Sequence, residues 1–153
     1  MSSQERRGII FDWIGTLVSR DGTPITHALE ILTLLTQSGL YDVSVISQAS
    51  NPERRIRDIH ASTLNPYITY SRATPQKTPQ SYQDMMGLMQ TESRSTTVID
   101  DRTIRGIQIG NQLGCRTIWF KNGEHARELP TRETGQPTKT ITSLSELIGL
   151  LLQ

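Results

Sequence analysis

The sequence is short of several features that would each point to a particular class of protein. It contains one cysteine, Cys115, in 153 residues, so no disulfide can form within the chain, which is typical of a reducing compartment. No apolar stretch approaches the roughly 20 residues that cross a bilayer, and the amino terminus lacks a signal peptide's hydrophobic region. We therefore expect a cytoplasmic protein with no membrane partner.

An excess of charge of one sign is also lacking. Sixteen basic residues are interspersed with 15 acidic ones, for a formal net charge of +1. Such a chain has no field that would recruit a nucleic-acid backbone. The densest basic cluster, Arg54, Arg55 and Arg57, is interpreted as the solvated face of a helix in preference to a patch that binds phosphates. We therefore expect no nucleic-acid partner. The three histidines are scattered without ligand spacing, which makes a zinc site improbable.

What the chain does have is a regular alternation of two patterns. Its length and 35% hydrophobic content suit one core, so we expect a single domain over residues 1–153. Short runs rich in β-branched residues alternate with segments of helical periodicity. We expect strands at 8–13, 43–47, 67–70, 96–100, 116–120 and 139–141, and helices at 26–37, 52–60, 79–90, 102–113 and 144–151. A capping box at Ser143 and Glu146, and Gly39 and Gly114 just after helices, support these limits.

The alternation predicts the fold class. Strands separated by helices pair in parallel through right-handed crossovers, which gives a doubly wound α/β sheet with helices on both faces. Ligands of such sheets bind at the carboxyl ends of the strands. Asp12 and the pair Asp100 and Asp101 fall at such ends.

Four strand ends carry the candidate site. Asp12 could act as a nucleophile or a metal ligand, or could merely cap the turn before Gly15. Ser47 could donate to a phosphoryl oxygen, or act as a turn or cap residue. Lys77, ahead of a helix, could offset the charge of a phosphate, or be an ordinary solvated lysine. Asp100 and Asp101 would repel each other unless a cation or lysine were near, which suits Mg²⁺, although a metal-free acidic turn stays open.

The order of these residues resembles the four motifs of the haloacid dehalogenase-like (HAD-like) superfamily. Asp12-Trp13-Ile14-Gly15-Thr16 is similar to the family's Asp-x-Asp-Gly-Thr, and Lys77-Thr78-Pro79 to its Lys-x-Pro. The resemblance implies an Mg²⁺-dependent hydrolase of phosphoric monoesters in which Asp12 attacks phosphorus while Ser47 and Lys77 neutralise the phosphoryl oxygens. The metal would be held by Asp12, the backbone carbonyl of Ile14, and Asp101 or Asp100.

Two positions depart from the family pattern. Ile14 stands where the phosphatases carry a general acid and base, and Gly106 where many members carry another acid. Because Ile14 cannot act as a general acid and base, we expect the hydrolysis rate to be about 10²–10⁴-fold lower. The resemblance thus implies either a slow phosphohydrolase or a catalytically silent binding or scaffold protein. A receiver domain of the response-regulator type is disfavoured, because it would carry the acid pair first and the acceptor Asp in mid-chain.

The spacing of the motifs also limits the architecture. The segment from Asp12 to Ser47 is just long enough for a loop, a helix and a strand, so we expect no cap domain. An open site could accept a small or macromolecular phosphorylated substrate, or be roofed by a second copy in a homo-oligomer. We expect an exposed Trp13 to border its mouth, unless that side chain packs in the core.

Overall fold

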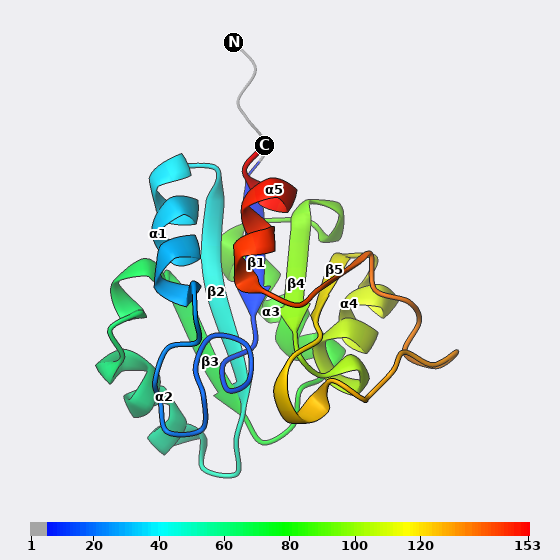
Figure 1. The fold of residues 1–153 in the computed structure, drawn as a ribbon, viewed down its shortest axis with the longest axis horizontal. Coiled ribbons are helices and arrows are strands. Elements are labelled where there is room, and N and C mark those ends of the chain that lie inside the picture. Colours follow the sequence, from blue (N-terminus) through cyan, green and yellow to red (C-terminus); the bar gives the residue numbers. More distant parts are fainter. Residues whose placement is uncertain (1–5) are drawn as a thin grey trace.

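Six parallel strands make up the centre of the computed structural model, which describes residues 6–153 (Figure 1). Their order across the sheet is β3-β2-β1-β4-β5-β6. This order begins in the middle with β1 and grows outward in both directions, as a doubly wound sheet does. The strands are β1 Arg7–Phe11, β2 Tyr41–Gln48, β3 Tyr70–Thr74, β4 Thr96–Asp100, β5 Arg116–Phe120 and β6 Lys139–Ile141.

Helices cover both faces of the sheet. They are α1 Ala28–Ser38, α2 Pro52–Ala61, α3 Pro79–Met89, α4 Gln108–Leu113 and α5 Leu147–Leu151. In Figure 1, α1 and α5 lie in front of the sheet. A π-helical turn, Thr103–Ile107, precedes α4, and a 3-10 turn, Leu144–Glu146, precedes α5. The predicted α/β class with helices on both faces is confirmed.

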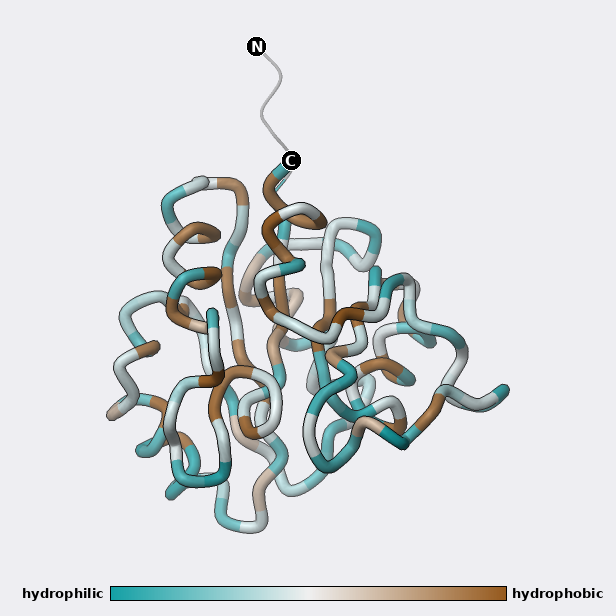
Figure 2. Tube along the Cα trace, viewed as in Figure 1, coloured by the Kyte–Doolittle hydropathy of each residue, from teal (hydrophilic) through white to brown (hydrophobic). Residues whose placement is uncertain are grey.

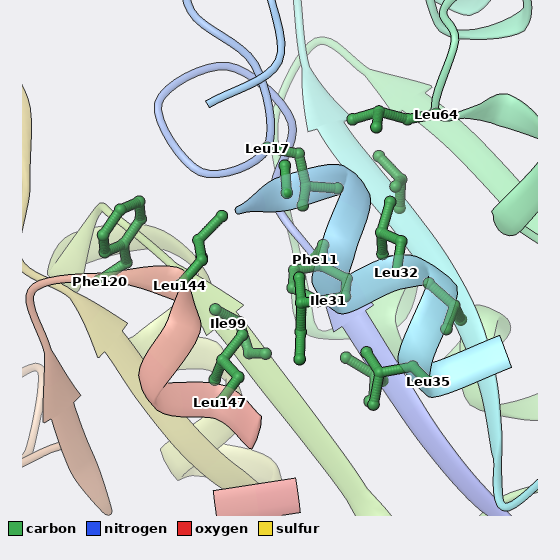
Figure 3. Packing of buried hydrophobic residues seen from close by; sticks show 14 of the residues in the cluster. Phe11, Leu17, Ile31, Leu32, Leu35, Leu64, Ile99, Phe120, Leu144 and Leu147 are labelled. Carbon is green, nitrogen blue, oxygen red and sulfur yellow. The ribbon is translucent and has the colours of Figure 1, made fainter. Parts of the chain in front are cut away.

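Alternate residues of the strands face two separate hydrophobic clusters. Ile9 and Phe11 of β1 pack with α1, α2 and α5, whereas Ile10 packs with α3 and α4. Figure 3 shows the first cluster, in which Leu32 of α1 and Leu147 of α5 approach the sheet from one side. Because the central strands β1, β2, β4 and β5 are mostly buried on both faces, their sequences are largely continuous apolar runs rather than alternating ones.

Most predicted boundaries agree with the structure within a few residues, but the predicted position of the third strand was wrong. Residues 67–70 were expected to be extended, yet Asn65–Tyr67 form a 3-10 turn and β3 covers Tyr70–Thr74. This strand lies at the sheet edge and only partly buries its side chains, so it carries no apolar run that marks it. The shift matters because β3 ends close to Lys77.

The helix ends and the carboxyl end of the sheet follow the sequence signals. Gly39 and Gly114 end α1 and α4, and Ser143 and Glu146 form the expected capping box. Residues 12–27, between β1 and α1, form a loop with isolated β-bridges, which leaves no separate cap domain there. The loops at the end where the strands finish are mostly hydrophilic (Figure 2). Among residues 6–153, no helix combines the length and apolar character needed to cross a membrane.

Candidate functional site

The carboxyl ends of the central strands β1 and β4 bring three carboxylates together. The backbone N–H of Asp12 donates to the Ile99 carbonyl at 2.9 Å, so Asp12 continues the sheet beside β4. Asp12, Asp100 and Asp101 each offer one oxygen, and these oxygens lie within 4.8 Å of one another. The sequence prediction that these acids converge is therefore confirmed, and all three side chains are buried.

Lys77 lies between two of these carboxylates. Its Nζ is 2.8 Å from Oδ1 of Asp12 and 2.9 Å from Oδ2 of Asp100, and its side chain is 1% exposed. The lysine is therefore no solvated surface residue. Its loop is held on both sides, because the Lys77 N–H donates to Gln48 Oε1 and Thr78 caps α3.

Asp100 is fully supplied with hydrogen-bond donors. Besides Lys77, the backbone N–H groups of Arg102 and Gly106 donate to its two oxygens, each at 2.9 Å. A Cβ at position 106 would stand 2.4 Å from Asp100 Oδ2. Gly106, which the sequence marks as a missing acid, therefore makes room for Asp100.

Asp101 is the carboxylate that lacks donors. Its Oδ1 is buried without a hydrogen-bond partner among residues 6–153. Gly15, at φ 91°, passes so close that a Cβ there would meet Oδ2 of Asp101 at 2.3 Å. A buried oxygen without a donor fits a cation ligand. The geometry therefore favours Asp101 over Asp100, with Asp12, as the residues that could hold a metal.

The charges of the cluster do not balance within the protein. Burial, with repulsion from Asp12 and Asp100, raises the pKa of Asp101 to about 9. Burial also raises the pKa of Asp100, with a further contribution from Asp12. Burial would raise the pKa of Asp12 too, but Lys77, together with hydrogen bonds from Asp101 and the Trp13 backbone, outweighs burial and lowers the value. The lysine's own pKa is raised well above its usual value, because the two carboxylates outweigh its burial. One lysine faces three carboxylates, so a divalent cation would complete the cluster.

Ser47 and Arg55 form a second part of the site. Ser47 is buried at the end of β2, and its Oγ accepts a hydrogen bond from Arg55 Nη1 at 2.7 Å. The same Nη1 reaches the Gln48 carbonyl at 3.3 Å. Sequence reasoning missed Arg55 by treating its cluster as a solvated face. The available signal was its place in the first turns of the helix that follows Ser47.

Two cavities open on these residues. The smaller one, about 260 Å³, is lined by Asp12, Ser47 and Asp101 among others. The larger one, about 620 Å³, lies between the loop after β1 and one side of α2. Ile14, Arg20 and Arg55 line both cavities. Trp13 borders the larger cavity but is 3% exposed and belongs to the core, so the expectation of an exposed ring was wrong.

Comparisons with known proteins agree with the fold. A family model for HAD-hydrolase-like proteins matches residues 75–147. YfnB from Bacillus subtilis, a HAD-family protein solved with bound magnesium, superposes with a TM-score of 0.79 at 13% identity, covering 96% of this chain and 99% of that one. A HAD phosphatase from Thermococcus onnurineus gives 0.79 at 10% identity, covering 95% and 97%. No curated protein sequence matches the chain. At these identities the structural likeness shows the fold.

A first prediction concerns the space beside Asp100. We expect Gly106→Ala to lower the free energy of unfolding by about 1–3 kcal/mol, because its methyl group would displace the Asp100 carboxylate. Gly87→Ala, in α3 with nothing within 4 Å, is the matched control and should be neutral or slightly stabilising. Urea unfolding followed by circular dichroism measures both. Equal effects of the two substitutions would contradict the requirement for glycine at 106.

A second prediction follows from the raised pKa of Asp101. Because that pKa is about 9, the carboxyl carries a proton at pH 7, and a cation that binds there must displace it. Titration with Mg²⁺ as the probe cation should release about one proton at pH 7. Its affinity should rise with pH up to about pH 9. Calorimetry in buffers of different ionisation enthalpy measures the release, and Asp101→Asn should abolish it. Cation binding by the wild type without proton release would show this assignment to be mistaken.

Proposed function

We propose that this chain, a member of the HAD-like superfamily, is an Mg²⁺-dependent phosphohydrolase that forms an aspartyl phosphate on Asp12. The observation that carries the proposal is the contact of Lys77 with Asp12 at 2.8 Å. It lowers the pKa of a buried carboxylate that burial alone would raise. Asp12 is therefore ionised at neutral pH and borders a cavity from which a phosphoryl group can be reached.

The surrounding residues suit the first chemical step. One oxygen of Asp12 attacks phosphorus in line with the leaving group. Ser47 accepts its hydrogen bond from Arg55, so its own hydroxyl proton is free to donate to a phosphoryl oxygen. Thr16 Oγ1 donates to Asp12 Oδ2 at 3.2 Å and fixes the carboxylate. A bound Mg²⁺, held by Asp12, Asp101 and the Ile14 carbonyl, would supply charge neutralisation and orientation of the phosphoryl group.

Ile14 limits the rate of both steps. It lines the cavity with a half-buried apolar side chain and can neither protonate a leaving group nor activate water. The missing proton transfer corresponds to roughly 3–5 kcal/mol of barrier. We therefore propose a slow enzyme, whose phosphorylated substrate is a small molecule or a macromolecule.

Ile14 also favours a second candidate function, a catalytically silent binding or scaffold protein. The buried cluster argues against it. Three carboxylates and a lysine out of contact with water cost several kcal/mol unless they are fully paired. Asp101 keeps an oxygen without a donor within the described part of the chain. An oxygen that a cation could bind supports the phosphohydrolase over the scaffold protein.

The third prediction tests the phosphoryl site without the natural substrate. Beryllofluoride with Mg²⁺ mimics a phosphoryl group on an aspartate, so calorimetry should show tight, Mg²⁺-dependent binding to the wild type. Asp12→Asn should lose this binding, because it removes the charge that holds the mimic. Asp84→Asn, on the exposed side of α3, is the matched control and should bind normally. A folded wild type that fails to bind would favour the scaffold function.

The fourth prediction concerns the missing acid and base. Ile14→Asp should raise kcat/KM for an alkyl phosphomonoester such as glycerol phosphate by about 10²–10⁴-fold. Ile14→Asn, which has nearly the same shape as Asp but transfers no proton, is the control. Steady-state release of inorganic phosphate measures both variants. Equal rates for the two would mean that proton transfer at position 14 does not limit the reaction.

A further inference from the structure

The larger cavity adjoins the smaller one over Asp12, and we call it the exit cavity. It is joined to the smaller cavity over Asp12 by the three residues that line both, Ile14, Arg20 and Arg55. Its volume of about 620 Å³ lies within the usual range of small-molecule sites, about 300–1,000 Å³. The leaving group of the substrate therefore has a defined and spacious place.

Cationic side chains line this exit. Arg20, Arg54 and Arg55 border the larger cavity, together with the acids Asp21 and Asp58. Among residues 6–153, neither Arg54 nor Arg55 has a carboxylate partner within 4 Å. Arg20 pairs with Glu124 at the surface. Two guanidinium groups thus remain available to an anion.

The acid Asp21 is ionised, because hydrogen bonds from Ser19 and Thr23 lower its pKa to about 2, so it offsets part of this charge from a position fixed by its own loop. Its carboxylate accepts hydrogen bonds from Ser19 Oγ at 2.6 Å and from the Thr23 backbone N–H at 2.9 Å. It is therefore engaged within its own loop. Asp58 lies on the exposed side of α2, one helical turn beyond Arg54. The side chains nearest to the junction with the Asp12 cavity are two arginines and an isoleucine.

These residues can stabilise a departing anion but cannot protonate it. Ile14 has no proton to give, and an arginine keeps its proton because its pKa exceeds about 12. An alkoxide is about as basic as hydroxide, whose conjugate acid has a pKa of about 15.7, so it leaves poorly without a proton. A carboxylate, with a pKa of about 4, or a phosphate, with a second pKa of about 6, needs none.

We propose that the substrate is a phosphoric anhydride, either an acyl phosphate or a phosphoanhydride, whose leaving group departs as an oxyanion toward Arg54 and Arg55. This inference rests on the proposed function and names its substrate class. An oxygen of Asp12 bonds to phosphorus while the bridging P–O bond breaks, and the electron pair stays on the carboxylate or phosphate that leaves. Water then attacks the aspartyl phosphate, releasing H₂PO₄⁻ and restoring the Asp12 carboxylate.

The test compares leaving groups on the full chain with Mg²⁺. Acetyl phosphate represents the acyl phosphates, ADP the phosphoanhydrides and glycerol phosphate the alkyl esters. The rate measured with the Asp12→Asn protein is subtracted from each rate, and the difference is divided by the uncatalysed rate of the same compound. At least one anhydride should exceed glycerol phosphate by about 10²-fold or more. Ile14→Asp should raise kcat/KM for glycerol phosphate and change kcat/KM for the favoured anhydride by no more than about threefold, because kcat/KM reports the first step and not the hydrolysis of the aspartyl phosphate. The faster of acetyl phosphate and ADP identifies the kind of anhydride.

A matched pair of arginine variants tests the exit cavity. Arg54→Gln should lower kcat/KM for the favoured anhydride about tenfold. Arg57→Gln is the control, since Arg57 is exposed on the same helix and does not line the cavity. Circular dichroism should show both variants folded. An equal effect of the two substitutions would overturn the role of the cavity.

The outcomes separate this inference from the proposed function. Glycerol phosphate hydrolysed as well as both anhydrides, after correction, would overturn the substrate class and leave the phosphohydrolase standing. Beryllofluoride binding without Asp12-dependent turnover of either anhydride would also overturn the substrate class, because the phosphoryl site would be intact. Absence of both binding and turnover would overturn the proposed function itself.

Discussion

The buried contact of Lys77 with Asp12 and Asp100 is the interaction on which the site depends. A lysine and carboxylates that are this far from water are stable only while each has its partners, because an unpaired buried charge costs several kcal/mol. The lysine is placed by a loop that starts after β3 and is capped at α3, whereas the acids are placed by β1 and β4. The contact thus joins three strands and one helix cap at a single point. Each of these elements must fold correctly before the charges are paired.

The same contact sets the requirements on its neighbours. The two oxygens of Asp100 accept hydrogen bonds from Lys77 and from two backbone N–H groups, one of which belongs to Gly106. Because the carboxylate lies so close to Gly106, no side chain fits at that position. Asp101, directly after it, faces Gly15 and keeps an oxygen without a donor among the residues that the structure covers. Two adjacent aspartates therefore have different roles. Asp100 fixes the lysine, and Asp101 keeps an oxygen that a cation could bind in place of the proton of that carboxyl group.

Sequence reasoning predicted the parts of this site that depend on strand order. Because parallel strands finish at one edge of the sheet, Asp12 and the acid pair had to converge once the strands were identified. It could not predict what depends on packing at close range. Gly106 looked like the loss of an acid, but the space it leaves is visible only with Asp100 in place. Arg55 looked like a solvated cation, although its guanidinium bonds the hydroxyl of Ser47. The third strand was misplaced because an edge strand buries too little surface to leave an apolar signal.

Ile14 gives the site an asymmetry between its two chemical steps. A good leaving group makes the first step independent of a proton donor, and the arginines of the exit cavity assist it. The second step always requires attack by water on an aspartyl phosphate, whatever the substrate was, and Ile14 offers no base for it. The choice of substrate can therefore compensate for Ile14 in the first step only. In the enzyme that we propose, hydrolysis of the aspartyl phosphate would therefore limit turnover, and the phosphorylated form of Asp12 would be the species that accumulates during the reaction.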